Sequence, residues 1–284
     1  SNKDAPRLTR REDLLAALRE ERVWDLAIIG GGATGLGVAL DAAMRGFSVV
    51  LVESRDFAAG TSSRATKLVH GGVRYLAQGN VPLVTEALHE RTRLLHNAPH
   101  LAQPLAFVMP SYQWWEVPFY GIGLKMYDLL AGSHGLGRTE FLSRHQTLQC
   151  LPGVQPAGLV GGVKYWDGQF DDARVALALA RTAAAQGALV INHCEMKGLI
   201  HEAGRVVGLT CEDTETRAAL NLRARCVINA TGVWVDGLRQ MDGDALGRPS
   251  RPMVAPSQGV HLVVDREFLP GDHALLVPKT RDGR

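Results

Sequence analysis

The sequence has few cysteines, and they are widely separated. No two of them form a Cys-x-x-Cys pair, and they stand at Cys150, Cys194, Cys211 and Cys226. This spacing excludes the common zinc-finger and dithiol redox motifs, and it is typical of a protein that works in a reducing compartment. Because the sequence shows no secretory signal pattern either, we expect a cytoplasmic location.

Several other features are missing as well. No run of about 18 apolar residues occurs, so no membrane-spanning helix is predicted. The 31 basic and 29 acidic residues give a net charge of +2, which provides no electrostatic case for nucleic-acid binding. The motifs G-x-x-x-x-G-K-S/T of nucleoside triphosphatases and G-x-S-x-G of serine hydrolases are absent. No metal site is predicted, because Pro99 interrupts the histidine pair His96 and His100.

A glycine motif follows the first apolar run. Residues 26–29 are apolar and lack alternation, which is typical of a parallel strand buried on both faces. Gly30, Gly32 and Gly35 then have the spacing G-x-G-x-x-G. Glycines at these positions allow a tight turn, a close approach to a pyrophosphate, and close packing of a helix on a strand.

The residues after the motif complete a dinucleotide-binding unit. Residues 34–45 have a helical pattern, and residues 47–52 form a second apolar strand that ends at Glu53. The helix N-terminus carries unpaired N–H groups and a partial positive charge, so it suits a pyrophosphate. Glu53 stands where a carboxylate binds a ribose hydroxyl, which disfavours NADP. The unit therefore predicts dinucleotide binding and leaves NAD and FAD both open.

The remaining pattern predicts an α/β protein. Residues 1–22 are expected to form a short charged helix, and residues 54–75 a polar loop. Prolines are expected to break regular structure at Pro99, Pro104 and Pro110. Further helices are expected at 82–97, 114–131 and 171–186. Strands are expected at 158–166, 189–192, 226–230, 259–264 and 274–277, and a three-stranded meander at 196–201, 205–212 and 218–224.

A set of motifs resembles one family closely. The glycine turn, Glu53, TSSRATKLVHGGVRYL at 61–76, FDDAR at 170–174 and NATGVW at 229–234 resemble the FAD-dependent, aerobic glycerol-3-phosphate dehydrogenases. Residues 61–76 are the most specific part of a resemblance that begins near Trp24. It implies a Rossmann-like FAD-binding domain with a parallel sheet and a β-meander, plus an antiparallel-sheet substrate domain, both incomplete at the C-terminus.

The resemblance also implies an order of domains. The expected parts are an N-terminal helical extension at 1–22, the FAD-binding domain at 23–98 and 169–240, and the substrate domain at 99–168 and 241–284. Asp282 and Gly283 favour a hairpin turn, but only Arg284 follows them. We therefore expect a longer native chain. The family uses a further segment to complete the flavin and phosphate sites, so this piece alone is expected to retain FAD weakly and to turn over little substrate.

The family implies roles for particular residues. The expected FAD-binding residues are Gly30, Gly32, Ala33, Thr34, Gly35, Glu53, Thr61, Ser62, Ser63, Thr66, Lys67, His70, Met196, Ala230, Thr231 and Gly232. Arg74, with Tyr75, is expected to bind the substrate phosphate, because a planar guanidinium makes paired hydrogen bonds. His70 or His261 is expected to be the catalytic base, because a histidine titrates near neutral pH. The sequence does not decide between the two histidines.

The implied reaction is the oxidation of sn-glycerol 3-phosphate to dihydroxyacetone phosphate. A hydride leaves C2 for flavin N5, and the reduced flavin of this family passes its electrons to a membrane quinone. An aromatic segment is typical either of an interfacial helix or of a cap packed on the substrate domain, and it contains Trp114, Trp115, Phe119, Tyr120 and Lys125. The quinone favours peripheral attachment to the cytoplasmic face of the membrane. A homodimer is compatible with the sequence.

Three other functions stay open. A glycerol-3-phosphate oxidase of the same fold would reduce oxygen, and an amine oxidase would share the FAD domain but act on a different substrate. The third is a catalytically incomplete flavin-binding fragment. Oxygen consumption without added quinone identifies the first alternative, and flavin reduction by an amine rather than a phosphate ester identifies the second.

Overall fold

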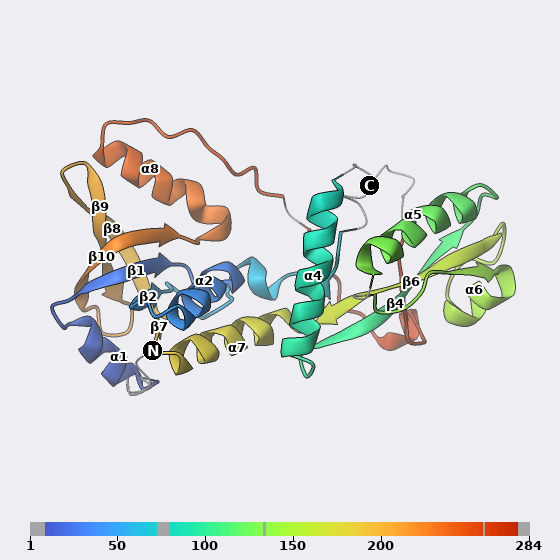
Figure 1. Ribbon diagram of the computed structural model, residues 1–284, viewed down its shortest axis with the longest axis horizontal. Helices are drawn as coiled ribbons and strands as arrows, with labels where there is room; N and C mark the ends of the chain where they lie inside the picture. Colours follow the sequence, from blue (N-terminus) through green and yellow to red (C-terminus); the bar gives the residue numbers. More distant parts are fainter. Residues whose placement is uncertain (1–8, 73–79, 133–134, 258, 278–284) are drawn as a thin grey trace. The chain divides into compact units, whose positions relative to one another are not determined.

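The computed structural model describes residues 9–72, 80–132, 135–257 and 259–277. Contacts between residues divide the chain into two compact units. Figure 1 colours the chain along its sequence, from blue at the N-terminus to red at the C-terminus. Unit 1 comprises Ser1–Ala65 and Asp172–Gly259, and unit 2 comprises Thr66–Asp171 and Val260–Arg284. Each unit therefore consists of two separate stretches of sequence, and each has its own β-sheet.

Unit 1 is built on a six-stranded sheet in the order β7-β2-β1-β10-β9-β8. Its strands are β1 (Val23–Ile29), β2 (Val49–Val52), β7 (Leu189–Ile191), β8 (Cys194–Glu202), β9 (Arg205–Asp213) and β10 (Ala219–Asn229). β7, β2 and β1 are parallel to their neighbours, whereas β8 and β9 form an antiparallel meander. β2 reads VVLV and is buried along its whole length, as expected of a central parallel strand. The predicted Rossmann-like sheet with a meander is confirmed.

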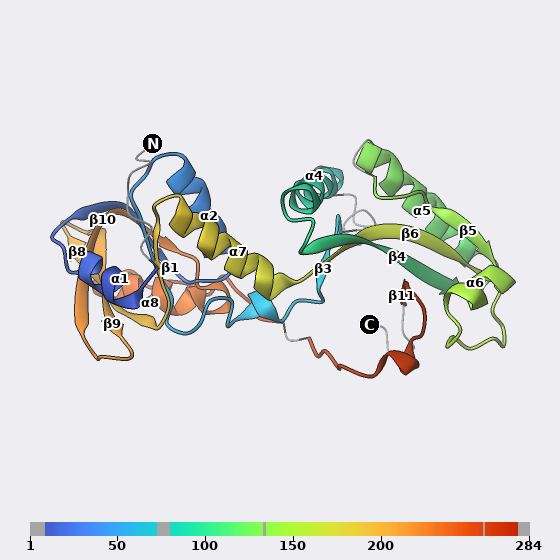
Figure 2. The same cartoon turned by 90° about the horizontal axis from the view of Figure 1, so that it is seen from below.

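Helices cover both faces of this sheet (Figure 2). α2 (Ala33–Met44) and α7 (Asp172–Ala185) pack on one face through buried alanines, whose small side chains allow the two helices to lie close together. α1 (Arg11–Leu18) and α8 (Val235–Ala245) contribute leucines to the core on the other face. Leu18 is only 2% exposed, and burying such a side chain stabilises a fold by about 1.5–3 kcal/mol. The predicted N-terminal helix is thus an integral part of unit 1.

β10 differs from the prediction. Separate strands were expected at 218–224 and 226–230, but Ala219–Asn229 form one continuous strand. Its first half pairs antiparallel with β9, and its second half pairs parallel with β1. One strand therefore joins the meander to the parallel sheet, and it ends beside the glycine turn.

Unit 2 is built on a five-stranded sheet in the order β11-β4-β6-β3, with β5 paired to β6. Its strands are β3 (Leu68–Val69), β4 (Ala102–Ser111), β5 (Glu140–Ser143), β6 (Gly161–Phe170) and β11 (His273–Leu275). The described pairings are antiparallel except for β11 with β4, which confirms the expected sheet type. Its helices are α4 (Val81–Asn97), α5 (Glu116–Ala131) and α6 (Arg144–Cys150).

The prolines at 104 and 110 do not break the chain, contrary to the prediction. Both lie inside β4, opposite Gly168 and Gly162 of β6. Alternate residues of a strand direct their N–H and C=O groups to opposite edges. Val108 is an even number of residues away from both prolines, and its carbonyl accepts the Leu276 N–H from the β11 side. The nitrogens of Pro104 and Pro110 therefore face away from β6, outside the three residues that β11 pairs. A strand tolerates proline at such unpaired positions.

The structure also corrects the expectations for two segments. No strand forms over residues 259–264, where Val263 is 99% exposed, because no described strand pairs with them. Residues 54–75 were expected to be a loop, but they contain a 3-10 turn at Thr61–Ser63 and the strand β3.

The division into units differs from the expected domain boundaries. Residues 66–98 belong to unit 2 rather than to the dinucleotide-binding unit, because α4 packs against α5 and β4. The chain returns to unit 1 at Asp172. The Asp172 carboxylate joins the two stretches of this unit, because it accepts the N–H of Ala65 at 3.0 Å and that of Ala173 at 2.7 Å.

The two glycines of α2 allow a test of the close packing at the turn. A Cβ at residue 35 would lie 2.0 Å from the Gly30 carbonyl oxygen, whereas a Cβ at residue 37 would meet nothing within 4 Å. We expect Gly35→Ala to lower the free energy of unfolding by about 3 kcal/mol, and Gly37→Ala to raise it by about 0.5–1 kcal/mol. Urea denaturation measures both; equal effects of the two substitutions would contradict the packing described.

Candidate cofactor site

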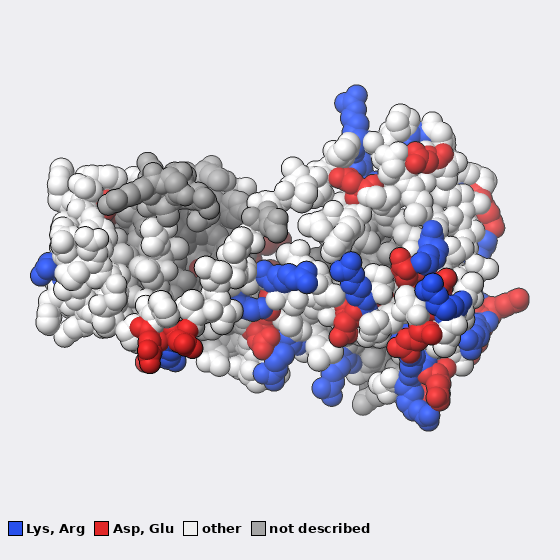
Figure 3. Space-filling view, turned by 180° about the vertical axis from the view of Figure 1, so that it is seen from behind, with Lys and Arg blue, Asp and Glu red and all other residues white. Residues whose placement is uncertain are grey.

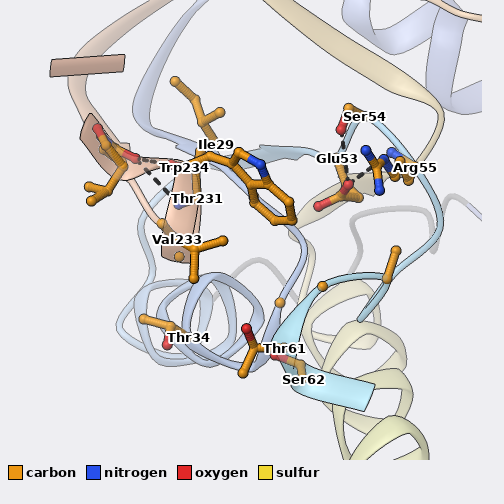
Figure 4. Close-up of a pocket in the computed structure, with 18 of the residues that line it drawn as sticks. Ile29, Thr34, Glu53, Ser54, Arg55, Thr61, Ser62, Thr231, Val233 and Trp234 are labelled. Atoms are coloured by element: carbon orange, nitrogen blue, oxygen red, sulfur yellow. Dashed lines mark hydrogen bonds between the residues drawn. The ribbon is translucent and has the colours of Figure 1, made fainter. Parts of the chain in front are cut away.

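An open cavity of about 730 Å³ lies in unit 1 at the carboxyl ends of β1, β2 and β10. Figure 4 shows side chains from these ends and from the 3-10 turn at Thr61–Ser63 around it. From β1 the chain leads through α2 to β2 on one side, while β10 lies on the other side of β1. In open α/β sheets, ligands bind at the carboxyl ends of the strands where the order changes direction in this way.

Glycines form the floor of the cavity through close backbone contacts. Gly30 has φ +112°, and a Cβ there would lie 2.4 Å from the carbonyl oxygen of Ala230. The Gly30 N–H donates to the Val52 carbonyl at 2.9 Å, and the Ala230 N–H donates to Ile29 at 2.9 Å. Only glycine adopts this conformation without strain. The turn that leaves β1 can therefore lie directly against the end of β10.

The N-terminus of α2 opens on the cavity. Its N-cap, Gly32, has no capping side chain, and Gly32 and Thr34 line the cavity. The N–H of Ala33 donates to the Ser62 hydroxyl at 2.9 Å. The other early N–H groups of a helix have no partner within the helix, and together with the helix dipole they favour an anion such as a pyrophosphate.

The Glu53 carboxylate is held in place by the glycine turn. One oxygen accepts the Gly31 N–H at 2.6 Å, and the other accepts the Arg55 N–H at 2.8 Å and the Ser54 hydroxyl at 3.2 Å. A carboxylate has about four acceptor positions, so it retains capacity for a ribose hydroxyl. Glu53 also lines the cavity, so it stays the predicted partner of a ribose hydroxyl.

Two large side chains at this site were not predicted. Trp234 is 56% exposed and lines the cavity, and the Arg55 guanidinium carbon lies 5.8 Å from the centre of its ring. That distance falls within the range of a cation–π contact. Gly60 leaves room for the ring, since a Cβ there would be 3.2 Å from it. The sequence signal was the last residue of NATGVW, a tryptophan in the 3-10 turn that follows the end of β10.

The cavity brings together most of the predicted cofactor residues. Those that line it are Gly30, Gly32, Thr34, Glu53, Thr61, Ser62, Met196, Ala230, Thr231 and Gly232. Ala33, Gly35 and Ser63 belong to the same turn, helix and 3-10 turn but do not line it. The glycine contacts, the helix N-terminus and the carboxylate suit the pyrophosphate and ribose of a dinucleotide.

The other predicted residues belong to unit 2. Thr66, Lys67 and His70 are exposed and stand around β3, and His261 is exposed in the stretch without regular structure. The Lys67 carbonyl accepts the Phe170 N–H at 2.9 Å. Arg74 and Tyr75 lie outside the described residues.

Neither a metal centre nor a membrane-spanning helix is found in the described part of the chain. No group of three or more His, Cys, Asp or Glu side chains there is arranged to hold a metal ion. Among the described helices, none has the length and apolar character needed to cross a bilayer. On the face shown in Figure 3, acidic and basic side chains alternate over unit 1, so they form no patch of one sign.

The fold and the cavity define a dinucleotide-binding α/β protein of the Rossmann type. Residues 25–284 match the family model described as FAD dependent oxidoreductase. The chain belongs to this family, and its cofactor is FAD. The residues of the cavity fit this group, and FAD supplies a hydride-accepting ring when it is bound.

Individual relatives are similar over most of this chain. The mitochondrial glycerol-3-phosphate dehydrogenase of Rattus norvegicus is 47% identical over 96% of this chain and 39% of its own length. That of Saccharomyces cerevisiae is 41% identical over 99% and 48%. The structure of the glycerol-3-phosphate dehydrogenase from Bacillus halodurans, complexed with FAD, has a TM-score of 0.63 and 35% identity over 82% of this chain and 38% of that chain. This chain thus spans less than half the length of these relatives.

Removal of the Glu53 carboxylate tests the cofactor site. Glu53→Ala deletes both the acceptor for a ribose hydroxyl and the partner of the Gly31 N–H. Because a hydrogen bond to a charged group contributes about 1.5–3 kcal/mol, we expect FAD affinity to fall about 10- to 100-fold in a fluorescence titration of the apoprotein.

Glu202→Ala is the matched control. Glu202 pairs with Arg223 at 2.9 Å away from the cavity, and its loss is expected to leave FAD affinity unchanged within about twofold. An unchanged affinity in Glu53→Ala would count against the assigned ribose position.

Proposed function

We propose that the protein oxidises sn-glycerol 3-phosphate to dihydroxyacetone phosphate with FAD as the hydride acceptor. One observation carries the proposal: the chain is 41–47% identical over 96–99% of its length to relatives named glycerol-3-phosphate dehydrogenase. The identity extends through both units, so it includes more than the glycine turn that many flavoproteins share. Because the chain spans less than half of those relatives, the activity is proposed for the whole protein.

Residues of unit 2 are the proposed substrate-binding and catalytic groups. Lys67 and His70 stand beside β3, and the segment that they begin continues to Arg74 and Tyr75. An arginine at the phosphate would make paired, charge-assisted hydrogen bonds. His70 or His261 would accept the proton of the C2 hydroxyl, since an imidazole is a common general base in enzymes.

Flavin reduction tests the substrate directly. We expect anaerobic glycerol 3-phosphate to bleach the flavin band of the FAD-loaded, full-length protein, and glycine at the same concentration to leave it unchanged. Bleaching by the amine alone would replace the proposal with an amine oxidase. Rapid reoxidation by oxygen without quinone would instead identify a glycerol-3-phosphate oxidase, and no bleaching by either compound would leave a flavin-binding protein without this activity.

We further propose that the protein lies in the cytoplasm, attaches to the membrane surface through α5, and passes electrons to a quinone. One face of α5 packs inward through buried residues such as Leu124 and Tyr127. The other face exposes the apolar side chains of Phe119, Ile122, Met126 and Leu129, and Trp114 and Trp115 are exposed directly before the helix. Contiguous exposed apolar surface with tryptophan is typical of a helix that lies in a membrane interface.

Charge on this face tests the attachment. Phe119 is 65% and Ile122 61% exposed, so glutamate at both positions removes apolar contact area without disturbing the core. We expect Phe119→Glu/Ile122→Glu to lower liposome flotation of the full-length protein more than tenfold, because each buried apolar side chain contributes about 1.5–3 kcal/mol.

Met44→Glu is the control for this experiment. Met44 ends α2 in unit 1 and is 66% exposed, and its replacement should leave flotation unchanged. If the double variant floats normally but changes its sedimentation, the α5 face joins two copies of the chain instead.

A further inference from the structure

A buried polar network lies in unit 2, away from the cofactor cavity. Arg91 of α4, Tyr127 of α5 and Asp167 of β6 are 1%, 1% and 2% exposed, respectively. Arg91 Nη1 donates to Asp167 Oδ1 at 3.0 Å, and the Tyr127 hydroxyl donates to Asp167 Oδ2 at 3.0 Å. Two helices and the central strand therefore meet at one carboxylate.

The network ends on a backbone group of the neighbouring loop. The Gly71 N–H donates to the Tyr127 hydroxyl oxygen at 2.8 Å. Burial, followed by the charge of Asp167, raises the pKa of Tyr127 well above its ordinary value. The phenol therefore keeps its proton, donates a hydrogen bond to the Asp167 carboxylate, and accepts one from the Gly71 N–H.

The contact with Gly71 is close and depends on glycine. A Cβ at residue 71 would lie 2.4 Å from the Tyr127 hydroxyl oxygen and 2.6 Å from a methyl of Leu88. On the other side of His70, Val69 pairs with Gly168, the residue directly after Asp167. The Gly168 N–H also donates to Asp167 at 3.0 Å. The backbone is thus held immediately before and immediately after His70, while the His70 side chain is exposed.

We propose that Tyr127, supported by Asp167 and Arg91, is a positioning residue that fixes the backbone of His70 for proton transfer. This inference rests on the proposed function, which makes His70 a candidate base. A buried ion pair is a costly way to stabilise a core, since apolar residues of similar size often serve as well or better. The Arg91–Asp167 pair instead orients a carboxylate that accepts the Tyr127 hydroxyl. The same hydroxyl then fixes the position of the Gly71 backbone.

Tyr127→Phe is the test, because it removes the hydroxyl and keeps the ring. Hydrogen exchange of the Gly71 amide and steady-state kinetics with glycerol 3-phosphate are measured on the FAD-loaded, full-length protein. We expect exchange at Gly71 to rise about tenfold and kcat to fall about 10- to 100-fold, since a displacement of about 1 Å has an effect of this size. KM and FAD affinity should stay within about twofold, because Tyr127 is 1% exposed and does not line the cavity.

Tyr112→Phe is the control. Tyr112 is a tyrosine of unit 2 whose hydroxyl donates to the Gln155 carbonyl at 3.0 Å. The same loss of a hydroxyl there should change neither Gly71 exchange nor kcat. Unchanged Gly71 exchange and kcat in Tyr127→Phe would overturn the proposal, as would a rise in exchange spread evenly over unit 2.

The experiment separates the two proposals. If the unmodified protein oxidises no glycerol 3-phosphate, the proposed function fails, and Gly71 exchange alone then decides the positioning role of Tyr127. If the unmodified protein is active and Tyr127→Phe raises exchange without lowering kcat, the loop is held as described, but the role in proton transfer is contradicted.

Discussion

Close backbone packing at the glycine turn is the constraint on which unit 1 depends. A Cβ at residue 35 would lie 2.0 Å from the Gly30 carbonyl oxygen, and one at residue 30 would lie 2.4 Å from that of Ala230. At these two glycines the chain therefore passes close to neighbouring backbone, that of the turn itself at Gly35 and that of the end of β10 at Gly30. This contact aims the N-terminus of α2 at the carboxyl ends of the strands, and Glu53 secures the turn through the Gly31 N–H at 2.6 Å. The cavity, which fits FAD, follows from that arrangement rather than from any single lining residue.

Unit 2 places its loop by a different physical means. Its central contact also needs a glycine, Gly71, but the group against it is the hydroxyl of Tyr127, which is held by a buried ion pair rather than by apolar packing. Apolar packing tolerates small shifts, whereas a chain of hydrogen bonds depends strongly on direction and distance. The unit that contains the candidate base thus uses the more geometrically demanding interaction, as expected where a side chain must meet a reacting proton.

The sequence predicted what depends on local pattern, and it missed what depends on partners distant in the chain. The glycine spacing with Glu53 predicted a turn whose residues line the cavity, and the apolar periodicity located α1, α2, α4, α5 and α7. The prediction that Pro104 and Pro110 break regular structure was wrong, because a strand accepts a proline where its nitrogen faces an unpaired edge. Residues 259–264 have a strand pattern but no described partner. Arg55 and Trp234 meet across the cavity from separate stretches, and Asp167 joins α4 to α5, so neither contact was visible in local spacing.

A crystal structure of the protein with FAD bound is the most direct test of this account. The account predicts the pyrophosphate at the N-terminus of α2, within hydrogen-bond distance of its first free N–H groups, and a ribose hydroxyl on the Glu53 carboxylate. The ring system would extend past Thr61 and Ser62. A pyrophosphate bound elsewhere, with the α2 N-terminus open to solvent, would contradict the central claim that the glycine turn builds the cofactor site.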